Sequence, residues 1–311
     1  MQLSEYDKPA DIIAYYDSES KSERVDIIID DDVAESLDLR HYGSKNRGRI
    51  REIALIDYDA DQSTDICIIC EKGICLYLGY LEFDISDRNR FVEDIELSDG
   101  IETICGTQIV FEDFKKAINY PESEGVFNNW QDAYKFEIDL EHIREQSSGL
   151  GNNHYELAYI NEDSIPELIA FISLGETFFS FDLENGQIKR LSDEASISYF
   201  VSGGTYNYVP YKNIVYFHDF HGWINNADIL RIDEDYKFRM TMHGEAYLFE
   251  DANRNKHFDI DEVELDAEVI HVNGIPLSES EYNTFYGDYE SSTALIGAYD
   301  YNEIIDEIGR S

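Results

Sequence analysis

The feature that most constrains this chain is a repeated order of apolar strand, acidic loop, apolar strand and turn. The order begins at Ile53 and returns in weaker form over residues 155–171. An alignment places residues 54–61 over residues 156–163. Weak internal similarity of this kind is typical of repeat architectures, in which each copy is one small structural unit that packs on its neighbours.

Hairpin turns are expected after each copy. Glu71-Lys72-Gly73 follows the first copy, Leu174-Gly175-Glu176 follows the second, and Asn185-Gly186 is a further hairpin signal. The chain has 5 Pro against 23 Tyr and 17 Phe, a balance that favours strands. We therefore predict a mainly β protein of repeated antiparallel hairpin units. We expect an irregular or incomplete β-propeller-like arrangement with a few short helices.

Short helices are expected over residues 112–119 and 302–308, the second with isoleucines along one face. Residues 278–281 form a capping box, a hydroxyl N-cap followed three residues later by Glu, and should open another helix. Near the N-terminus, residues 25–29 indicate a strand and residues 30–37 the start of a short helix.

A polar, Gly-rich segment at residues 147–153 is the best linker candidate. A length of 311 residues suits one large or two modest domains with real cores. We predict a β-rich N-terminal domain over residues 1–146, and a β-rich C-terminal domain with terminal helices over residues 154–311.

The first acidic loop (residues 57–65) has the spacing of calcium ligands. Asp57, Asp59, Asp61 and Asp65 would offer carboxylates, and Ser63 its backbone carbonyl. A hard cation needs six to eight oxygens converging at about 2.3–2.6 Å, which this pattern can supply. Clustered carboxylates also repel one another unless a cation lies between them.

The second acidic loop (residues 251–262) follows the EF-hand order of ligands. The ligands would be Asp251, Asn253, Asn255, the carbonyl of His257, Asp259 and a bidentate Glu262. Lys256 stands where a Gly normally allows the sharp turn, which predicts weak binding. The first acidic loop has more carboxylates and no basic residue among its ligands, so it should bind calcium more tightly. An Asp-rich turn without metal remains the alternative for both loops.

The middle loop (residues 159–167) is a degraded copy. Asn161, Asp163 and Glu167 occupy the third, fifth and ninth positions, but Tyr159 occupies the first. We therefore predict a structural turn held by Asx hydrogen bonds rather than by metal.

The acids outnumber the bases by 66 to 24, which gives a net charge of −42. This charge repels nucleic acids and anionic membranes, and attracts cations and basic proteins. A solvated acidic face partly offset by cations is one interpretation; nucleic-acid mimicry and salt adaptation are others. Arg47, Arg49 and Arg51 form a rare basic spot that is expected to offset nearby acids. No apolar run approaches the ~20 residues of a membrane span, so membrane insertion is not expected.

Four cysteines, Cys67, Cys70, Cys75 and Cys105, leave the redox compartment open. The first three lie in apolar runs around a turn, which favours core cysteines. A disulfide and a zinc site remain alternatives, although the spacing is loose for zinc.

Signals for catalysis are sparse. The chain has no Gly-x-Ser-x-Gly elbow, no P-loop and no Gly-x-Gly-x-x-Gly motif. His218 and His221 are the most site-like remaining pair, because they could bind a metal or supply a base. An aromatic loop in a Tyr-rich domain is the alternative for them. Acid pairs carry no information in a chain with 66 acids.

Three segments carry a resemblance to a known family: the first acidic loop with its apolar flanks, residues 160–169 and residues 272–283. The first two resemble the calcium loops of FG-GAP/VCBS-type repeats, found in integrin-α-like β-propellers. The third is similar to the C-terminal part of bacterial surface proteins that carry such loops. The resemblance implies an extracellular scaffold stabilised by calcium, often adhesive or carbohydrate-associated.

The sequence therefore predicts a calcium-binding, non-enzymatic surface or interaction module, with a protein or a carbohydrate as further ligand. A hydrolase acting on carbohydrate or a similar extracellular polymer is the alternative, with His218 and His221 in its cleft. An extracellular or cell-surface location requires that a leader was trimmed, because the N-terminus lacks the features of a signal peptide. A cytoplasmic location is the alternative.

Overall fold

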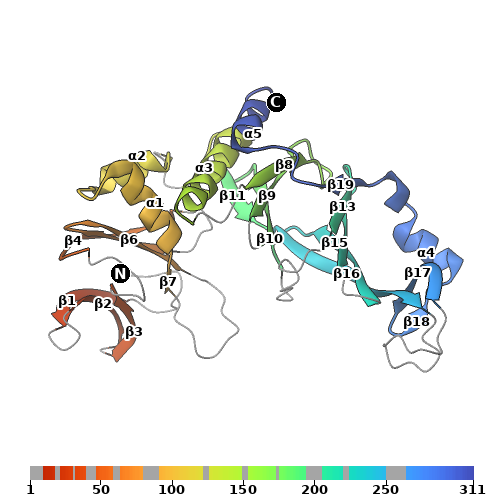
Figure 1. Cartoon of the computed structure of the whole chain (residues 1–311), viewed down its shortest axis with the longest axis horizontal. Helices are drawn as coiled ribbons and strands as arrows, with labels where there is room; N and C mark the ends of the chain where they lie inside the picture. The colour runs from red at the N-terminus through yellow and green to blue at the C-terminus, as the bar shows by residue number, and fades with distance from the viewer. Residues whose placement is uncertain are drawn as a thin grey trace. The chain divides into compact units, whose positions relative to one another are not determined.

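The computed structural model describes residues 10–17, 22–30, 32–39, 47–58, 64–79, 91–121, 126–148, 153–172, 175–193, 205–219, 224–249 and 264–311. Among these residues the fold is mainly β, with several antiparallel hairpin sheets and five α-helices (Figure 1). The predicted mainly β class built from antiparallel hairpins is confirmed. The chain divides into two compact units, Met1–Gly151 with Leu183–Ile188, and Asn152–Asp182 with Lys189–Ser311.

The first unit opens with an antiparallel sheet of β1 (Asp11–Asp17), β2 (Ser22–Ile29) and β3 (Asp32–Asp38). The strand predicted over residues 25–29 is confirmed. The helix start predicted over residues 30–37 is wrong, because that segment turns at Asp30 and pairs with β2 as a strand. Its side chains alternate, with Glu35 and Leu37 buried, so a period of two wins over local helix propensity.

A four-stranded meander follows, made of β4 (Ile50–Ile56), β5 (Asp65–Cys70), β6 (Gly73–Gly79) and β7 (Phe91–Glu93). The turn predicted at residues 71–73 connects β5 to β6. Every side chain of β5 is buried. One face of this sheet packs against the β1–β3 sheet in a shared apolar core, and helix α1 (Ile95–Cys105) packs against β6. Burial on both faces explains the unbroken apolar run of this strand.

Three helices complete the first unit: α1 (Ile95–Cys105), α2 (Phe111–Ala117) and α3 (Trp130–Ser148). The short helix predicted over residues 112–119 is confirmed by α2, whereas α1 and α3 were not predicted. Gly100 allows α1 and α3 to approach closely, because a Cβ there would lie 2.6 Å from Ile143 Cγ2. A side chain at position 100 would therefore push the two helices apart.

The tip of the next hairpin also belongs to the first unit. The Asn185-Gly186 turn connects β10 (Gly175–Asp182) to β11 (Gln187–Arg190), as predicted, and Gly186 takes a positive φ of 66°. Its carbonyl accepts a hydrogen bond from the Phe127 N–H at 2.7 Å. A Cβ at position 186 would lie 2.6 Å from the Phe127 carbonyl oxygen, so only glycine fits this contact.

The second unit begins with a second meander, in which β8 (His154–Ala158), β9 (Glu167–Ile172), β10 (Gly175–Asp182) and β11 (Gln187–Arg190) pair in chain order. A larger sheet follows in the order β18-β17-β16-β15-β14-β13-β19, with β12 pairing to β16. Its strands are β12 (Ser192–Asp193), β13 (Thr205–Val209), β14 (Ile214–Asp219), β15 (Ile224–Ile232), β16 (Lys237–Phe249), β17 (Glu264–Val272), β18 (Ile275–Pro276) and β19 (Thr293–Leu295).

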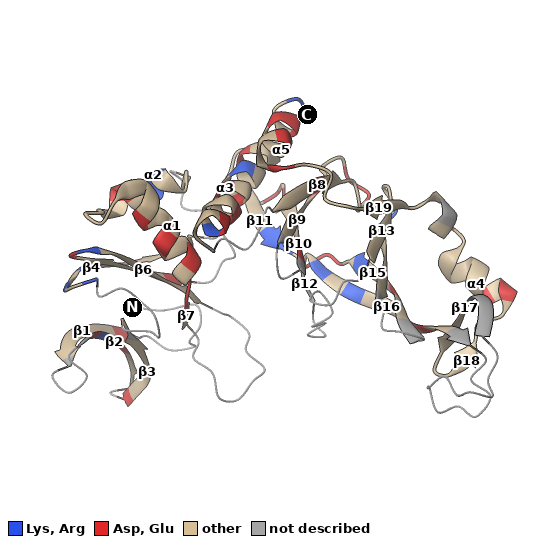
Figure 2. Cartoon of the chain, in the orientation of Figure 1, with Lys and Arg blue, Asp and Glu red and all other residues tan. Residues whose placement is uncertain are grey.

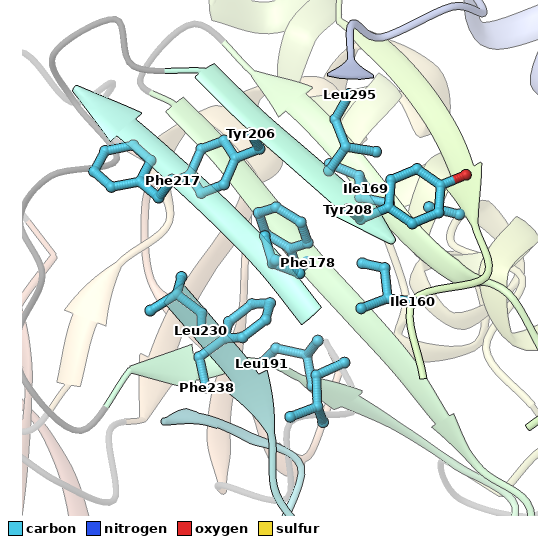
Figure 3. Close-up of a cluster of buried hydrophobic side chains, with 13 residues drawn as sticks. Ile160, Ile169, Phe178, Leu191, Tyr206, Tyr208, Phe217, Leu230, Phe238 and Leu295 are labelled. Carbon is cyan, nitrogen blue, oxygen red and sulfur yellow. The ribbon is translucent and has the colours of Figure 1, made fainter. Parts of the chain in front are cut away.

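The core of the second unit joins its two sheets. Phe178 of the meander packs edge-on against Tyr206 and Phe238 of the larger sheet, with ring centroids 5.3 and 5.2 Å apart (Figure 3). Phe217 lies 4.7 Å from the Tyr206 ring on the same side. These aromatic pairs add about 0.5–1.5 kcal/mol each to the burial of their surface.

Helices α4 (Glu279–Tyr286) and α5 (Tyr301–Ile308), with a 3₁₀ turn η2 (Tyr289–Ser291), complete the second unit. The predicted capping box is confirmed: the Ser278 hydroxyl accepts from the Glu281 N–H, and the Glu281 carboxylate accepts from the Ser278 N–H. Helix α5 buries Ile304 and Ile308, as its periodicity predicts.

The two meanders are copies of one unit. Ile56 pairs with Asp65 across β4 and β5, and Ala158 pairs with Glu167 across β8 and β9. Adding this same offset to a cross-strand pair of β4–β5 or β5–β6 gives a cross-strand pair of β8–β9 or β9–β10, wherever both copies have a counterpart. The starting residues of the strands keep this offset as well, because β9 begins as many residues after β5 as β10 begins after β6. The internal repeat read from the sequence is therefore a structural repeat.

Candidate functional site

The first acidic loop is closed at its base by the meander. Asp57 directly follows β4, and Asp65 opens β5 opposite Ile56, so the two ends of the loop lie side by side. Asp65 is fully buried. Its Oδ2 accepts a hydrogen bond from the Tyr58 N–H at 2.9 Å, and its Oδ1 accepts from the Gly79 N–H at 2.9 Å. The protein therefore fixes the orientation of this carboxylate.

The residues at the base of the loop suit a hard cation. An ionised carboxylate has about four lone-pair sites, so a carboxylate can accept hydrogen bonds and bind a cation at the same time. Asp57 lies at the other end of the loop. Asp59, Asp61 and Ser63 lie outside the described residues. The donor set is all oxygen and mostly carboxylate, which suits calcium or magnesium better than softer metals.

The middle loop uses the same closing contact. Glu167 occupies the position of Asp65, is fully buried, and accepts from the Ile160 N–H at 2.9 Å and the Ser180 hydroxyl at 3.3 Å. Asn161 Oδ1 accepts from the Asp163 N–H at 3.0 Å, and Asp163 Oδ1 accepts from the Ile165 N–H at 2.7 Å. These two Asx turns confirm the predicted structural turn.

The turn between β13 and β14 also holds the middle loop. Tyr211 donates its N–H to the Tyr159 carbonyl at 2.8 Å, and the two rings stack 5.2 Å apart. Asn213 donates its N–H to the Ile160 carbonyl at 2.7 Å. Tyr159 thus occupies the first ligand position with an aromatic contact. The loop is shaped by contacts within the protein.

Burial alters the chemistry of Glu167. Desolvation raises the pKa of Glu167 to about 7, and the nearby Asp163 adds to this effect. Backbone hydrogen bonds from Ile160 and Asn161 oppose it. The closing carboxylate of the middle loop therefore changes its charge near neutral pH.

The second acidic loop, Asp251–Glu262 in its entirety, lies outside the described residues. The strands that flank it are described: β16 and β17 pair antiparallel, with Phe249 opposite Glu264. The loop therefore connects two strands of one sheet, whereas an EF-hand loop connects two helices.

Of the two histidines singled out in the sequence, His221 lies outside the described residues. His218 lies on β14, half-buried, with its ring stacked on Tyr289 at 5.4 Å. Tyr289 also packs edge-on against Tyr216 at 5.1 Å. His218 therefore belongs to an aromatic cluster.

The structure also pairs an acid and a histidine that the sequence analysis missed. Asp228 on β15 is fully buried and lies directly opposite His243 on β16. Its Oδ1 is 2.7 Å from His243 Nδ1 and accepts from the Gly244 N–H at 3.3 Å. His243 is about half-exposed. The signal available in the sequence was an Asp inside the apolar run Ala227–Leu230, where a buried charge needs a partner.

Arg47, one of the three arginines of the basic spot, offsets nearby acids, as predicted. The Arg47 guanidinium is buried, with its Nε 2.5 Å from Glu102 and its Nη atoms 2.9 Å from Asp99 and 3.3 Å from Glu93. It therefore ties β7 and α1 to the start of β4. Glu102 also accepts from the Ile74 N–H at 3.3 Å.

The prediction of core cysteines is confirmed for three of the four. All four are free thiols; Cys67, Cys70 and Cys75 are buried, and Cys105 is partly exposed. Burial raises the pKa of Cys105, and the nearby Asp113 raises it further. Within the described ranges, no three His, Cys, Asp or Glu side chains come together as a metal site. Nor does any helix in those ranges have the length and hydropathy needed to cross a membrane.

Comparisons with known proteins add no identity to this geometry. No protein-family model matches the chain, and a search of curated proteins also finds no match.

Proposed function

We propose that this protein is a calcium-binding, non-enzymatic interaction module, with the first acidic loop as its main calcium site. The observation that carries the proposal is the comparison of its two repeats. Both close their loop with a buried acid, Asp65 or Glu167, held by the same backbone contact. They differ in the residues at the other ligand positions of the loop.

In the middle loop the first ligand position is Tyr159, and contacts within the protein hold the turn. In the first acidic loop the corresponding positions carry Asp57, Asp59 and Asp61. Three or four carboxylates on so short a loop repel one another, and a bound cation removes that cost. Calcium there would fix β4 to β5 and stabilise the native state.

The second acidic loop is the second proposed calcium site, with weaker binding because Arg254 and Lys256 lie within it. The resemblance to FG-GAP/VCBS-type repeats supports an extracellular or cell-surface role with a protein or carbohydrate partner. Calcium at extracellular concentration would fill sites of about 10⁻⁴–10⁻³ M affinity, and cytosolic calcium would leave them empty.

Thermal unfolding with and without calcium tests the proposal, using two equivalent substitutions. Asp61→Asn and Asp163→Asn remove the same charge from the same position of the two repeats, and the amide oxygen introduced by the second would keep the Asx hydrogen bond. At a calcium concentration of 100 times Kd, binding adds about 2.7 kcal/mol. This corresponds to a shift in Tm of roughly 5–10 °C. We expect Asp61→Asn to reduce that shift and Asp163→Asn to leave it unchanged.

A Tm that does not respond to calcium would refute the proposal, and so would an equal response of both variants. The ranking of the two sites has its own test. Asp59→Ala should weaken the tighter calcium-binding event in a calorimetric titration, whereas Asn253→Ala should affect only the weaker one. Loss of the tighter event in Asn253→Ala alone would reverse the ranking.

A further inference from the structure

A pocket of about 350 Å³ lies between the C-terminal end of α4 and the face of the larger sheet that α4 covers. Strands β14, β15 and β16 supply Tyr216, Arg231 and Thr241. Helix α4 and the turn after it supply Asn283, Thr284 and Asp288. Small-molecule sites have volumes of about 300–1,000 Å³, so this pocket is large enough for one small ligand.

Arg231 brings an unbalanced charge to this pocket. It lies directly opposite Arg239 on the neighbouring strand, and like charges in that position repel. The Arg239 Nε is 2.5 Å from Asp233 Oδ2, so its charge is paired. Among the described residues, Arg231 donates hydrogen bonds only from Nη1, to the carbonyls of Lys212 and Asn213 at 3.4 and 3.2 Å. Carbonyls accept these bonds but do not cancel the charge.

The acid in the pocket is already paired. Asp288 Oδ2 lies 2.9 Å from Lys212 Nζ. Among the described lining residues, Arg231 is therefore the one charged group without an oppositely charged partner. Figure 2 shows Lys and Arg on adjoining parts of β15 and β16 in a chain whose net charge is −42. An anionic group bound to Arg231 would relieve its repulsion with Arg239.

The rest of the lining suits hydroxyl groups. The Thr241 hydroxyl donates to the Ile229 carbonyl at 3.1 Å, and the Thr284 hydroxyl donates to the Ser280 carbonyl at 2.8 Å. Both oxygens can still accept a hydrogen bond from a ligand hydroxyl. The Asn283 amide is exposed and can both donate and accept. Buried Tyr216 and Ile229 form an apolar floor.

We propose that this pocket binds a small hydroxylated carboxylate, namely a sugar acid. The carboxylate would bind the Arg231 guanidinium, whose planar fork matches its geometry. The ligand hydroxyls would bind Asn283, Thr241 and Thr284. None of the residues that line this pocket belongs to an acidic loop, and the proposal does not depend on calcium binding.

Calorimetric titration with sodium glucuronate tests the proposal. The protein is first passed over a chelating resin, so that the calcium loops do not contribute, and the buffer contains 0.15 M NaCl. At that ionic strength the Debye length is about 8 Å, so distant acids are screened while contact with Arg231 is not. We expect binding with a Kd in the millimolar range, and at least tenfold weaker binding of glucose and of inorganic sulfate.

Two arginine variants form a matched pair. Arg231→Gln should weaken glucuronate binding at least tenfold, because it removes a charge-assisted contact. Arg239→Gln removes the same charge from the opposite strand and should change the affinity less than threefold. Thr284→Trp, which fills the pocket but keeps the charge, should abolish binding. Equal effects of the two arginine variants, unchanged affinity in Thr284→Trp, or equally tight binding of sulfate would each overturn the proposal.

Discussion

Replacing Glu167 by Gln should stabilise this protein above neutral pH, although Glu167 closes the middle loop. The carboxylate is fully buried, and desolvation raises its pKa from the ordinary 4.5 to about 7. A difference of one pKa unit corresponds to about 1.36 kcal/mol. The ionised carboxylate is therefore about 3 kcal/mol less stable in the folded than in the unfolded chain. Gln keeps an oxygen for the Ile160 N–H and has an amide that can donate to the Ser180 hydroxyl.

The sign follows from where the proton binds. Between pH 4.5 and pH 7 the folded chain keeps the Glu167 proton while the unfolded chain has lost it. The contribution of Glu167 to stability is therefore fully present below pH 4.5 and is lost as the pH rises through 7. The Gln variant has no such dependence at this position. Its advantage should grow from about 1 kcal/mol at pH 5.5 to about 3 kcal/mol at pH 8.5.

Urea denaturation of both proteins between pH 5.5 and pH 8.5 measures this difference, away from the isoelectric point near 4.2. Glu162→Gln is the control, because it removes an exposed acid from the same loop. Its difference from the parent protein should stay constant over this range. If Glu167→Gln destabilises the protein at every pH, the loop requires the ionised carboxylate and the reasoning is refuted.

Three further predictions concern other contacts. Arg47→Met should lower the free energy of unfolding by about 3–5 kcal/mol, because three acids lose a buried partner. Arg49→Met, an exposed control, should change it by less than about 0.5 kcal/mol in the same urea assay. Under native conditions a thiol reagent followed by mass spectrometry should modify Cys105 before the three buried cysteines; an earlier reaction elsewhere would contradict the burial pattern. Ser278→Ala should lower the free energy of unfolding by about 1 kcal/mol and speed amide hydrogen exchange in α4, whereas Ser280→Ala should do neither.

Local chemistry explains the part of the fold that could be predicted. The capping box of α4, the Asn185-Gly186 turn and the Asx turns of the middle loop each depend on residues close together in sequence. The internal repeat was visible because its strands and loop keep one offset. The sequence places Asp65 and Glu167 at the ninth position of their two loops, but it does not predict the hydrogen bonds that these buried residues make.

Contacts between distant segments explain what was missed. Residues 30–37 contain good helix formers, yet this segment forms a strand because it pairs with the edge of β2. Helix α3 has buried residues around much of its circumference and so lacks a clear apolar stripe. Asp228 and His243 meet only because β15 and β16 pair in one particular register. The environment of Arg231 depends on the register beyond an irregularity between Ile229 and Leu230, where the pairing shifts by one residue. A single sequence does not reveal which of many possible registers forms.

The tip of the β10–β11 hairpin has a consequence for synthesis on the ribosome. The first unit contains Leu183–Ile188, and Phe127 donates to the Gly186 carbonyl within it. Translation reaches residue 151 before this hairpin exists, so the first unit is completed only after most of the second meander has been made. The two units therefore cannot mature strictly one after the other. A chain cut between Gly151 and Asn152 would deprive the N-terminal fragment of a piece of its own fold.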